Sequence, residues 1–360
     1  MSLIKKAYIR GFSQVRMTVS RPKILQLGPW ENSKPEWDKL AQHADIIKCE
    51  SKNRDEFLQD LKDKYSDITN IARTFLSIAQ TGRFDAELVE ALPKSVVLIS
   101  HCGAGYDQID PEPLTKRNIQ LSNVTEPVEA PTALTAVYLT LAAMRNFQRG
   151  HDLLVEGKWP IGKCGGSPLG YDPEGKVVGI LGMGGIGRAI RDRLEPFGFE
   201  KIIYYNRKRL SPELEKGAEY VTYDELLSQS DVIMVSVPLN KNTHHLINAD
   251  SISKMKDGVI IVNTARGAVI DEAEITKALK DGKVGSFGSD VFEYEPEVSP
   301  ELYNLPNVVS LPHMGTHTYQ AMRNLEVWVV ENIHQYITTG KVKTIVPEQS
   351  GIDFGHSAMI

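Results

Sequence analysis

The chain has 360 residues, enough for two domains that each bury a hydrophobic core. Hydrophobic residues make up 41% and charged residues 24%, which is typical of globular proteins and excludes a disordered or fibrous chain. The formal net charge of −5 excludes nucleic-acid binding driven by bulk positive charge. The longest apolar helical stretch, 132–144, is too short to span a bilayer. We therefore expect neither a nucleic-acid nor a membrane partner.

Cysteines and the N-terminal segment bear on the compartment. Cys49, Cys102 and Cys164 lie far apart without C-x-x-C spacing, which indicates a reducing compartment and predicts no metal site. Residues 1–30 contain basic but no acidic side chains, and the first acid is Glu31. Such a segment is read either as a mitochondrial targeting sequence or as a basic extension. We favour the extension and a cytoplasmic location, with a mitochondrial location as the alternative.

Strand-like and helical patterns alternate through the first 125 residues. Strands are expected at 23–27, 45–48, 68–72 and 96–100. Helices are expected after Asn53 as N-cap and at 84–92. This alternation predicts parallel βαβ units joined by right-handed crossovers.

A second alternating series follows a helix that we expect from Pro131 to about 147 and a Gly- and Pro-rich loop at 156–175. Strands are expected at 177–181, 201–205, 231–237, 259–262, 284–290 and 308–311, and helices at 186–197, 224–229, 271–280 and 322–337. The predicted fold class is α/β: two doubly wound Rossmann-like domains with the active-site cleft between them. The predicted segments are a basic N-terminal extension (1–22), a discontinuous substrate domain (23–127 and 317–350), a dinucleotide-binding domain (128–316) and a tail (351–360).

A glycine-rich turn stands at the centre of the second series. The strand 177–181 leads into G-x-G-x-x-G, with Gly182, Gly184 and Gly187, and an amphipathic helix follows. Gly182 suits a tight turn, Gly184 lets the backbone approach a pyrophosphate, and Gly187 lets the helix lie close to the strand. The helix N-terminus then faces the phosphates, so the stretch predicts dinucleotide binding.

The residues after the next strand bear on the choice of dinucleotide. An acid about 20 positions past the glycines would bind the ribose 2′-hydroxyl of NAD, but here Asn206 is followed by Arg207 and Lys208. A carboxylate at this position would repel the 2′-phosphate of NADP. An amide followed by cations instead favours binding of that phosphate. We predict NADP(H) as the preferred cofactor, with NAD(H) possible. The alternative is that the cations form a solvated turn.

Three polar side chains of different kinds fall at one edge of the predicted sheet. Arg266 follows one strand, Glu295 follows the next beyond Asp290, and His313 ends the strand after that. An imidazole can protonate a carbonyl oxygen, and a neighbouring carboxylate orients it and favours its charged form. A guanidinium can hold a substrate carboxylate through two parallel hydrogen bonds. The set predicts reduction of a 2-keto acid, with His313 as acid/base, Glu295 as its partner and Arg266 as substrate anchor.

The first domain is expected to supply the other half of the substrate site. Gly103 and Gly105 follow a strand and can point backbone amides at the same carboxylate. Cys102 has no base beside it in sequence and is read as inert. Residues 73–76, including Leu76, are expected to line the pocket for the substrate's side chain.

In these motifs the chain resembles the D-isomer-specific 2-hydroxyacid dehydrogenase family, and within it the fungal glyoxylate/hydroxypyruvate reductases and the D-mandelate dehydrogenase group. The matching motifs are GAGYDQID (103–110), GYDPEGKVVGILGMGGIGR (170–188), NTHHLIN (242–248), MKDGVIIVNTARGAVIDE (255–272), DVFEYEP (290–296) and LPHMGT (311–316). They span most of the chain from about residue 95 to 345, and jointly they are highly specific.

The resemblance implies a catalytic Arg-Glu-His set at Arg266, Glu295 and His313, a nicotinamide contact at Asp290 and a carboxylate-binding turn at Ala104-Gly105. It also implies cofactor contacts at Gly184, Gly185, Ile186, Val237, Pro238, Thr264, Ala265 and Gly315. Family members usually form homodimers through the cofactor domain and the loop before it. That implies a dimer contact at 150–172 and brings Trp159 toward the partner's active site.

Two departures from the family pattern stand out. The helix after residue 131 lacks the expected acid near its start, and Ser289 replaces an apolar residue before Asp290.

Two other functions stay open. The first alternative function is a dinucleotide-binding regulatory module of the corepressor kind. The second is a reductase for bulky aromatic keto acids of the mandelate type. Formate oxidation is disfavoured, because Glu295 stands where that branch has a glutamine.

Overall fold

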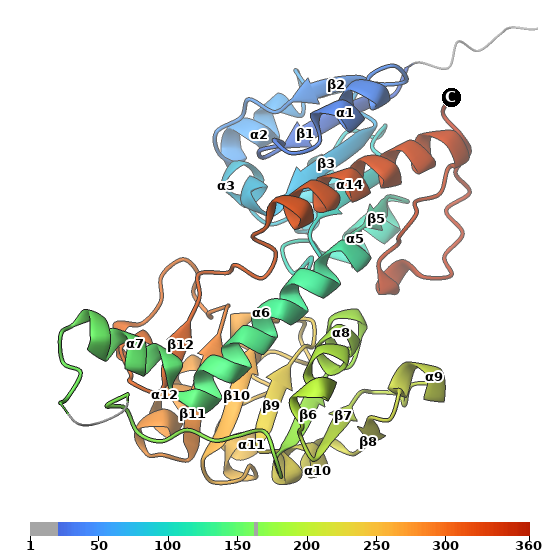
Figure 1. The fold of residues 1–360 in the computed structure, drawn as a ribbon. Coiled ribbons are helices and arrows are strands. Elements are labelled where there is room, and N and C mark those ends of the chain that lie inside the picture. The colour runs from blue at the N-terminus through green and yellow to red at the C-terminus, as the bar shows by residue number, and fades with distance from the viewer. Residues whose placement is uncertain (1–20, 162–164) are drawn as a thin grey trace, which may run out of the picture.

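The computed structural model describes residues 21–161 and 165–360. The predictions about residues 1–20 and Cys164 lie outside the described residues. Figure 1 shows two α/β bodies, one above the other, with the helix α6 (Glu126–Arg145) running from one to the other. The predicted fold class is confirmed.

The first body is built on a parallel sheet with the strand order β2-β1-β3-β4-β5. Its strands are β1 (Lys23–Leu27), β2 (Asp45–Lys48), β3 (Asn70–Thr74), β4 (Leu98–Cys102) and β5 (Gln120–Ser122). Its helices include α1 (Lys34–Leu40), α2 (Arg54–Asp60), α3 (Ile78–Thr81), α4 (Ala86–Ala91) and α5 (Pro111–Lys116). This order is one of the doubly wound arrangements, because the chain moves outward from β1 in both directions. Leu25, Ile71 and Ile99 are fully buried in the core.

The second body is built on a parallel sheet with the order β12-β11-β10-β9-β6-β7-β8. Its strands are β6 (Val177–Leu181), β7 (Lys201–Tyr205), β8 (Glu219–Tyr220), β9 (Val232–Val235), β10 (Val259–Asn263), β11 (Val284–Ser289) and β12 (Val308–Ser310). Its helices include α8 (Gly185–Leu194), α9 (Pro212–Glu215), α10 (Tyr223–Gln229), α11 (Ala249–Ser253), α12 (Glu272–Lys280) and α13 (Pro300–Tyr303). The strand order reverses between β6 and β9, and ligands of such sheets bind at that switch point, outside the carboxyl ends of the strands.

Two long helices connect the bodies. α6 packs against β10, β11 and α8 of the second body. α14 (Tyr319–Thr339) returns to the first body, where it packs against β4 and α1. The chain therefore crosses twice between the sheets, so the carboxyl-terminal helix shares a core with the N-terminal strands (Figure 1). No helix in the described ranges is long and apolar enough to cross a membrane.

The start of α6 corrects two expectations. The helix begins at Glu126, so Pro131 stands inside it and Pro127 occupies the first turn, where a missing N–H costs nothing. The expected lack of an acid near the helix start was also wrong, because Glu126 and Glu129 both lie in its first turn. The helix ends at Asn146, whose left-handed backbone (φ 53°) starts a separate helix α7 (Phe147–Val155) that was not predicted.

Candidate active site

A cavity of about 360 Å³ opens between the two sheets. The predicted site residues that line it are Ala104, Gly105, Gly184, Gly185, Ile186, Val237, Pro238, Thr264, Ala265, Arg266, Asp290, His313 and Gly315. Those that do not line it are Leu76, Gly182, Gly187, Asn206, Arg207, Lys208 and Glu295. Segments from both bodies therefore meet at one hollow, as parallel strands with adjoining carboxyl ends require.

The glycine-rich turn between β6 and α8 has the conformation that its sequence predicted. Gly182 adopts φ +96°, a region that side chains rarely enter. A Cβ on Gly187 would lie 2.4 Å from the carbonyl oxygen of Gly182, so only glycine allows this close packing of helix and strand. A Cβ on Gly184, the N-cap of α8, would meet nothing within 4 Å. The open space before the helix N-terminus fits a dinucleotide pyrophosphate, which the free amides there can bind.

Some polar side chains of the segment after β7 make structural contacts, and others are exposed to solvent. Asn206 accepts a hydrogen bond from the backbone N–H of Met183 at 2.7 Å, so its amide braces the glycine turn. Arg209 pairs with Glu215 at 2.8 Å. Arg207 and Lys208 are exposed, and no hydrogen bond or ion pair among the described residues engages their side chains. Two cations are thus available beside the predicted ribose position.

Arg266 lies in an ion pair that the sequence did not reveal. It follows β10, and its Nε donates to Oδ1 of Asp107 at 2.8 Å, across the two bodies. Its Nη1 donates to the carbonyl oxygen of Ala265, which leaves Nη2 without a hydrogen bond among the described residues. Burial raises the pKa of Asp107, but the charge of Arg266 and its hydrogen bond outweigh burial and hold that pKa below its usual range. The pair fixes the guanidinium at the cavity wall.

The turn after β4 brings its backbone against Arg266. A Cβ on Gly105 would lie only 2.1 Å from Nη2 of Arg266, so the glycine permits the contact. His101 holds the turn from below, with its Nε2 3.0 Å from the carbonyl oxygen of Gly105. Burial, followed by the charge of Arg73, lowers the pKa of His101 to about 3, so the ring is neutral and Nε2–H is the donor. Burial also raises the pKa of the Cys102 thiol, in agreement with its inert interpretation.

His313 and Glu295 form the pair that the sequence predicted. Nδ1 of His313 lies 2.7 Å from Oε2 of Glu295, which leaves the other ring nitrogen, Nε2, for the cavity. Oε1 of Glu295 accepts from the N–H of Phe292 at 2.9 Å. Burial raises the pKa of Glu295, but the hydrogen bond and charge of His313, with the Phe292 N–H, outweigh it and lower that pKa overall. The carboxylate is therefore ionised beside the imidazole.

Asp290 shapes the loop that carries the imidazole. Its side chain is buried, and its two oxygens accept from the backbone N–H groups of Met314 (2.6 Å) and Gly315 (2.7 Å). The N–H of His313 donates to the carbonyl oxygen of Asp290, and His313 adopts φ +55°. Burial raises the pKa of Asp290. Ser289 is buried, and its hydroxyl donates to the carbonyl oxygen of Val291, which explains how a polar residue is tolerated before Asp290.

The residues after β3 only partly match their prediction. Phe75 lines the cavity, with its ring 5.8 Å from that of His313. Leu76 is 64% exposed, outside the residues that line the cavity. Placing Arg73 in the pocket was wrong, because it is fully buried within β3 and bonded to Ser77 and Gln108.

Comparison with known proteins places the chain in a family. Residues 137–315 match the model of the D-isomer specific 2-hydroxyacid dehydrogenase, NAD binding domain. Glyoxylate reductase 1 of Saccharomyces cerevisiae is 55% identical over 339 residues, covering 93% of this chain and 97% of that protein. The chain therefore belongs to the D-isomer-specific 2-hydroxyacid dehydrogenase family.

Solved structures of glyoxylate reductases and of a D-mandelate dehydrogenase are also similar to this chain. A glyoxylate reductase from Paecilomyes thermophila is 44% identical with a TM-score of 0.88, covering 92% of this chain and 100% of that one. Holo D-mandelate dehydrogenase of Rhodotorula graminis is 31% identical with a TM-score of 0.84, covering 91% and 98%. An NADPH-dependent glyoxylate/hydroxypyruvate reductase of Sinorhizobium meliloti, in complex with NADP and malonate, is 29% identical with a TM-score of 0.79, covering 91% and 98%. The predicted resemblance is confirmed.

Proposed function

We propose that this protein reduces a small 2-keto acid of the glyoxylate or hydroxypyruvate type to the D-2-hydroxy acid, with NADPH as the hydride donor. The observation that carries the proposal is the meeting of a carboxylate-paired imidazole and an anchored guanidinium at one cavity beside a dinucleotide turn. The 55% identity to a protein named glyoxylate reductase supports the substrate class. The D configuration rests on the family alone.

The glycines of the turn between β6 and α8 support dinucleotide binding in the cleft. When bound, NADPH supplies a hydride to the keto carbon. The amides at the N-terminus of α8 would hold the pyrophosphate, and Arg207 and Lys208 would hold the 2′-phosphate. A solved relative whose name includes NADPH dependence supports this preference, although it shares only 29% of its residues with this chain. NAD(H) binding at lower affinity is compatible with the same groove.

His313 provides the proton. Its Nδ1 is held by Glu295, so the protonated ring presents Nε2–H to the keto oxygen, and the proton moves there as negative charge develops. The ionised carboxylate stabilises the imidazolium before the transfer and fixes the ring orientation. In the oxidative direction the neutral ring accepts the hydroxyl proton at the same nitrogen.

Arg266 and the turn at Ala104-Gly105 orient the substrate. Nη2 of Arg266 has no hydrogen bond among the described residues and lies directly over Gly105. A substrate carboxylate in the cavity, beside both Nη2 and the turn's backbone amides, receives hydrogen bonds from both domains. Its keto group then faces His313 across the cavity, and the guanidinium also stabilises the developing oxyanion.

Phe75 supports the runner-up substrate class. Its ring lines the cavity next to His313 and can contact the substrate's side chain. A small keto acid leaves this surface uncovered, whereas an aromatic keto acid would stack on it. The likeness to D-mandelate dehydrogenase makes phenylglyoxylate the natural comparison substrate.

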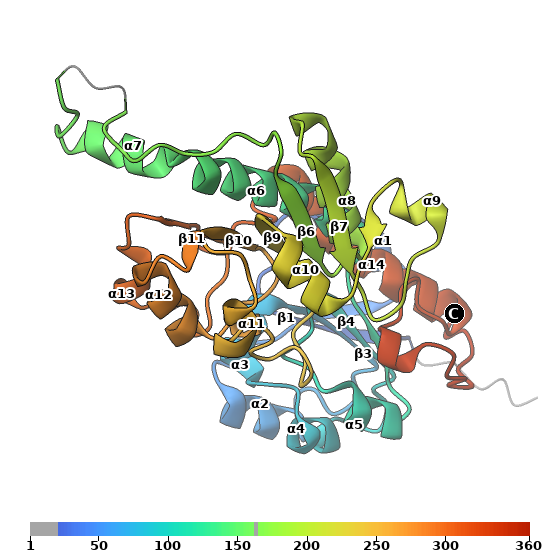
Figure 2. The same ribbon diagram turned by 90° about the horizontal axis from the view of Figure 1, so that it is seen from below.

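We further infer that the protein works in the cytoplasm as a homodimer, joined through the region 150–172. Leu154, Val155, Ile161 and Leu169 are each more than half exposed there, an unusual run of apolar side chains for a free surface. Figure 2 shows α7 and the adjoining segment extending away from the second sheet, where a partner could cover them. Light scattering on the purified protein tests this, since a monomeric mass would contradict it.

The function itself is tested by a substrate and cofactor panel. Absorbance of reduced nicotinamide is followed with NADPH or NADH against glyoxylate, hydroxypyruvate and phenylglyoxylate. We expect fast NADPH oxidation with glyoxylate or hydroxypyruvate and slow oxidation with NADH. Faster turnover of phenylglyoxylate would support the aromatic alternative. Tight NADPH binding without turnover of any keto acid would contradict the reductase and favour the regulatory module.

A further inference from the structure

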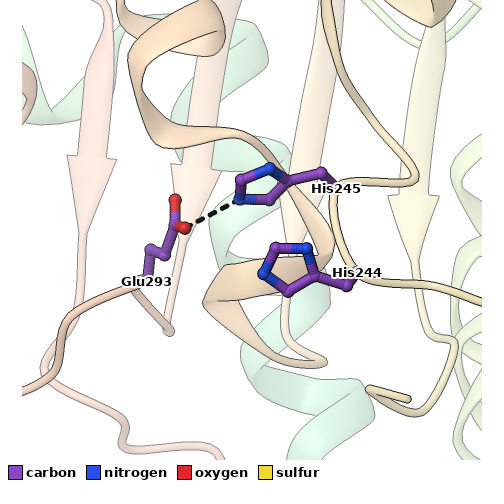
Figure 3. Close-up of side chains that lie close together, drawn as sticks. All are labelled: His244, His245 and Glu293. Atoms are coloured by element: carbon purple, nitrogen blue, oxygen red, sulfur yellow. Dashed lines mark hydrogen bonds and ion pairs between the residues drawn. The ribbon is translucent and has the colours of Figure 1, made fainter. Parts of the chain in front are cut away.

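The NTHHLIN motif (242–248) contains two adjacent histidines that the reductase mechanism does not use. In the structure His244 and His245 lie in the loop between β9 and α11, and Glu293 lies just beyond β11. A ring nitrogen of each histidine and a carboxylate oxygen of Glu293 all lie within 4.8 Å of one another. Figure 3 shows the ring of His245 above that of His244, with the carboxylate of Glu293 beside the His245 ring and joined to it by a hydrogen bond.

The backbone brings the two rings to the same side. Consecutive side chains in an extended segment point in opposite directions. His245 instead adopts φ +49°, and its N–H donates to the carbonyl oxygen of Ala268. The two imidazoles consequently stack with centroids 4.0 Å apart and planes 27° apart. A positive φ outside glycine is uncommon, and here it brings together two side chains of a type that can ligate a metal.

Glu293 is held in place opposite the rings. Its side chain is 9% exposed, and Oε1 lies 2.7 Å from Nε2 of His245. Its Oε2 accepts from the N–H of Glu272, and its own N–H donates to the carboxylate of Glu272. The carboxylate is therefore fixed by the backbone while one oxygen faces the imidazole.

Asp271 provides an outer support for the same group. Its Oδ2 lies 3.6 Å from Nδ1 of His245, while its Oδ1 caps α12. A metal-ligating imidazole characteristically has a carboxylate or carbonyl near its other nitrogen, which fixes the tautomer and increases the ligand's basicity. The carboxylates of Asp271, Glu272 and Glu293 together attract a cation to this point.

We propose that His244, His245 and Glu293 form a binding site for a borderline-soft divalent cation of the Zn²⁺ type. Two imidazoles and one carboxylate are the donor set of such ions, whereas Mg²⁺ and Ca²⁺ take oxygen ligands. The exposed ring of His244 turns to bring its nitrogen to the ion, and water completes the coordination. The metal then replaces the His245–Glu293 hydrogen bond as the link between the two segments.

The site lies on segments that flank the catalytic cavity but is separate from the catalytic residues. Val237 and Pro238 precede the histidines in the same loop and line the cavity, and Glu293 is two residues from Glu295. A bound ion therefore cross-links the loop after β9 to the segment that carries Glu295. Binding does not depend on the proposed reaction and can be measured without substrate.

The test is calorimetric titration of ZnCl2 into the tag-free protein after removal of metals with a chelator. We expect one saturable site per chain in the wild type, with binding weakened at least about tenfold in His244→Asn and in Glu293→Gln. MgCl2 should give no comparable binding. His43→Asn is the matched control, because it removes an imidazole from α1's neighbourhood in the other domain and should leave the site intact.

His244→Asn is the decisive variant, because no described side-chain hydrogen bond involves His244 and its loss cannot act through a structural contact of that kind. Co²⁺ titration adds an independent readout: a visible absorption band should appear in the wild type and be missing in His244→Asn. Equal Zn²⁺ binding by the wild type and His244→Asn would overturn the proposal. Equal loss in His43→Asn, or no saturable binding at all, would overturn it as well.

Discussion

Glu295→Gln isolates the effect of one charge on the proposed acid. The hydrogen bond between Glu295 and His313 is 2.7 Å long, and the two side chains are 27% and 36% exposed. A sheltered charge-assisted hydrogen bond contributes about 1.5–3 kcal/mol, and solvent screening at this exposure reduces the figure to about 1.4 kcal/mol. A loss of that size in the transition state corresponds to about a tenfold lower rate.

The direction of the expected change in rate follows from the charge of Glu295. The pKa of Glu295 lies below its usual range, so Glu295 is ionised at neutral pH and favours the imidazolium. Glutamine keeps the shape and the bond from Phe292 but removes the negative charge beside Nδ1 of His313, so the charged ring loses its electrostatic partner.

The assay is the rate of keto-acid reduction at saturating NADPH between pH 5 and pH 9. We expect kcat to fall about tenfold across this range, with NADPH affinity unchanged. A kcat within about twofold of the wild type would refute the assignment of Glu295 as the partner of the acid. A higher kcat in the variant would refute the electrostatic reasoning.

Three further substitutions test other parts of the structure. Gly105→Ala puts a methyl group 2.1 Å from Nη2 of Arg266, so kcat/KM should fall about 100-fold with little change in Tm; normal kinetics would contradict the close approach. Asn206→Asp keeps the acceptor for Met183 but adds a charge near the 2′-phosphate, so the NADPH/NADH ratio of kcat/KM should fall about tenfold, and an unchanged ratio would argue against this recognition. Glu326→Ala removes a buried carboxylate that accepts from the N–H of Asn32 and from the buried hydroxyl of Ser33, so the free energy of unfolding in urea should drop by about 3 kcal/mol. A drop below about 1 kcal/mol would show that water replaces the carboxylate.

The sequence predicted the features that local patterns determine. Gly182 and Gly187 could be assigned because a tight turn and a close helix–strand contact each require glycine. Arg266 and His313 could be brought together because parallel strands end at the same edge of a sheet. The Glu295–His313 hydrogen bond followed from the same reasoning.

Long-range partners could not be predicted in this way. Asp107 binds Arg266 from 159 positions away, and nothing in its own segment indicates which cation it meets. Arg73 was misplaced because β3 starts two residues later than the apolar pattern suggested, so a side chain expected after the strand lies within it. The break between α6 and α7 depends on one left-handed residue, Asn146, that no periodicity reveals.

If His313 delivers the proton in an NADPH-dependent reduction, its removal in His313→Ala should stop reduction and spare cofactor binding. NADPH oxidation with glyoxylate or hydroxypyruvate and NADPH binding by fluorescence are measured on the wild type and the variant. Reduction is expected to fall by at least about 100-fold, while NADPH affinity stays within about twofold. Turnover at the wild-type rate in His313→Ala would show that His313 is not the proton donor.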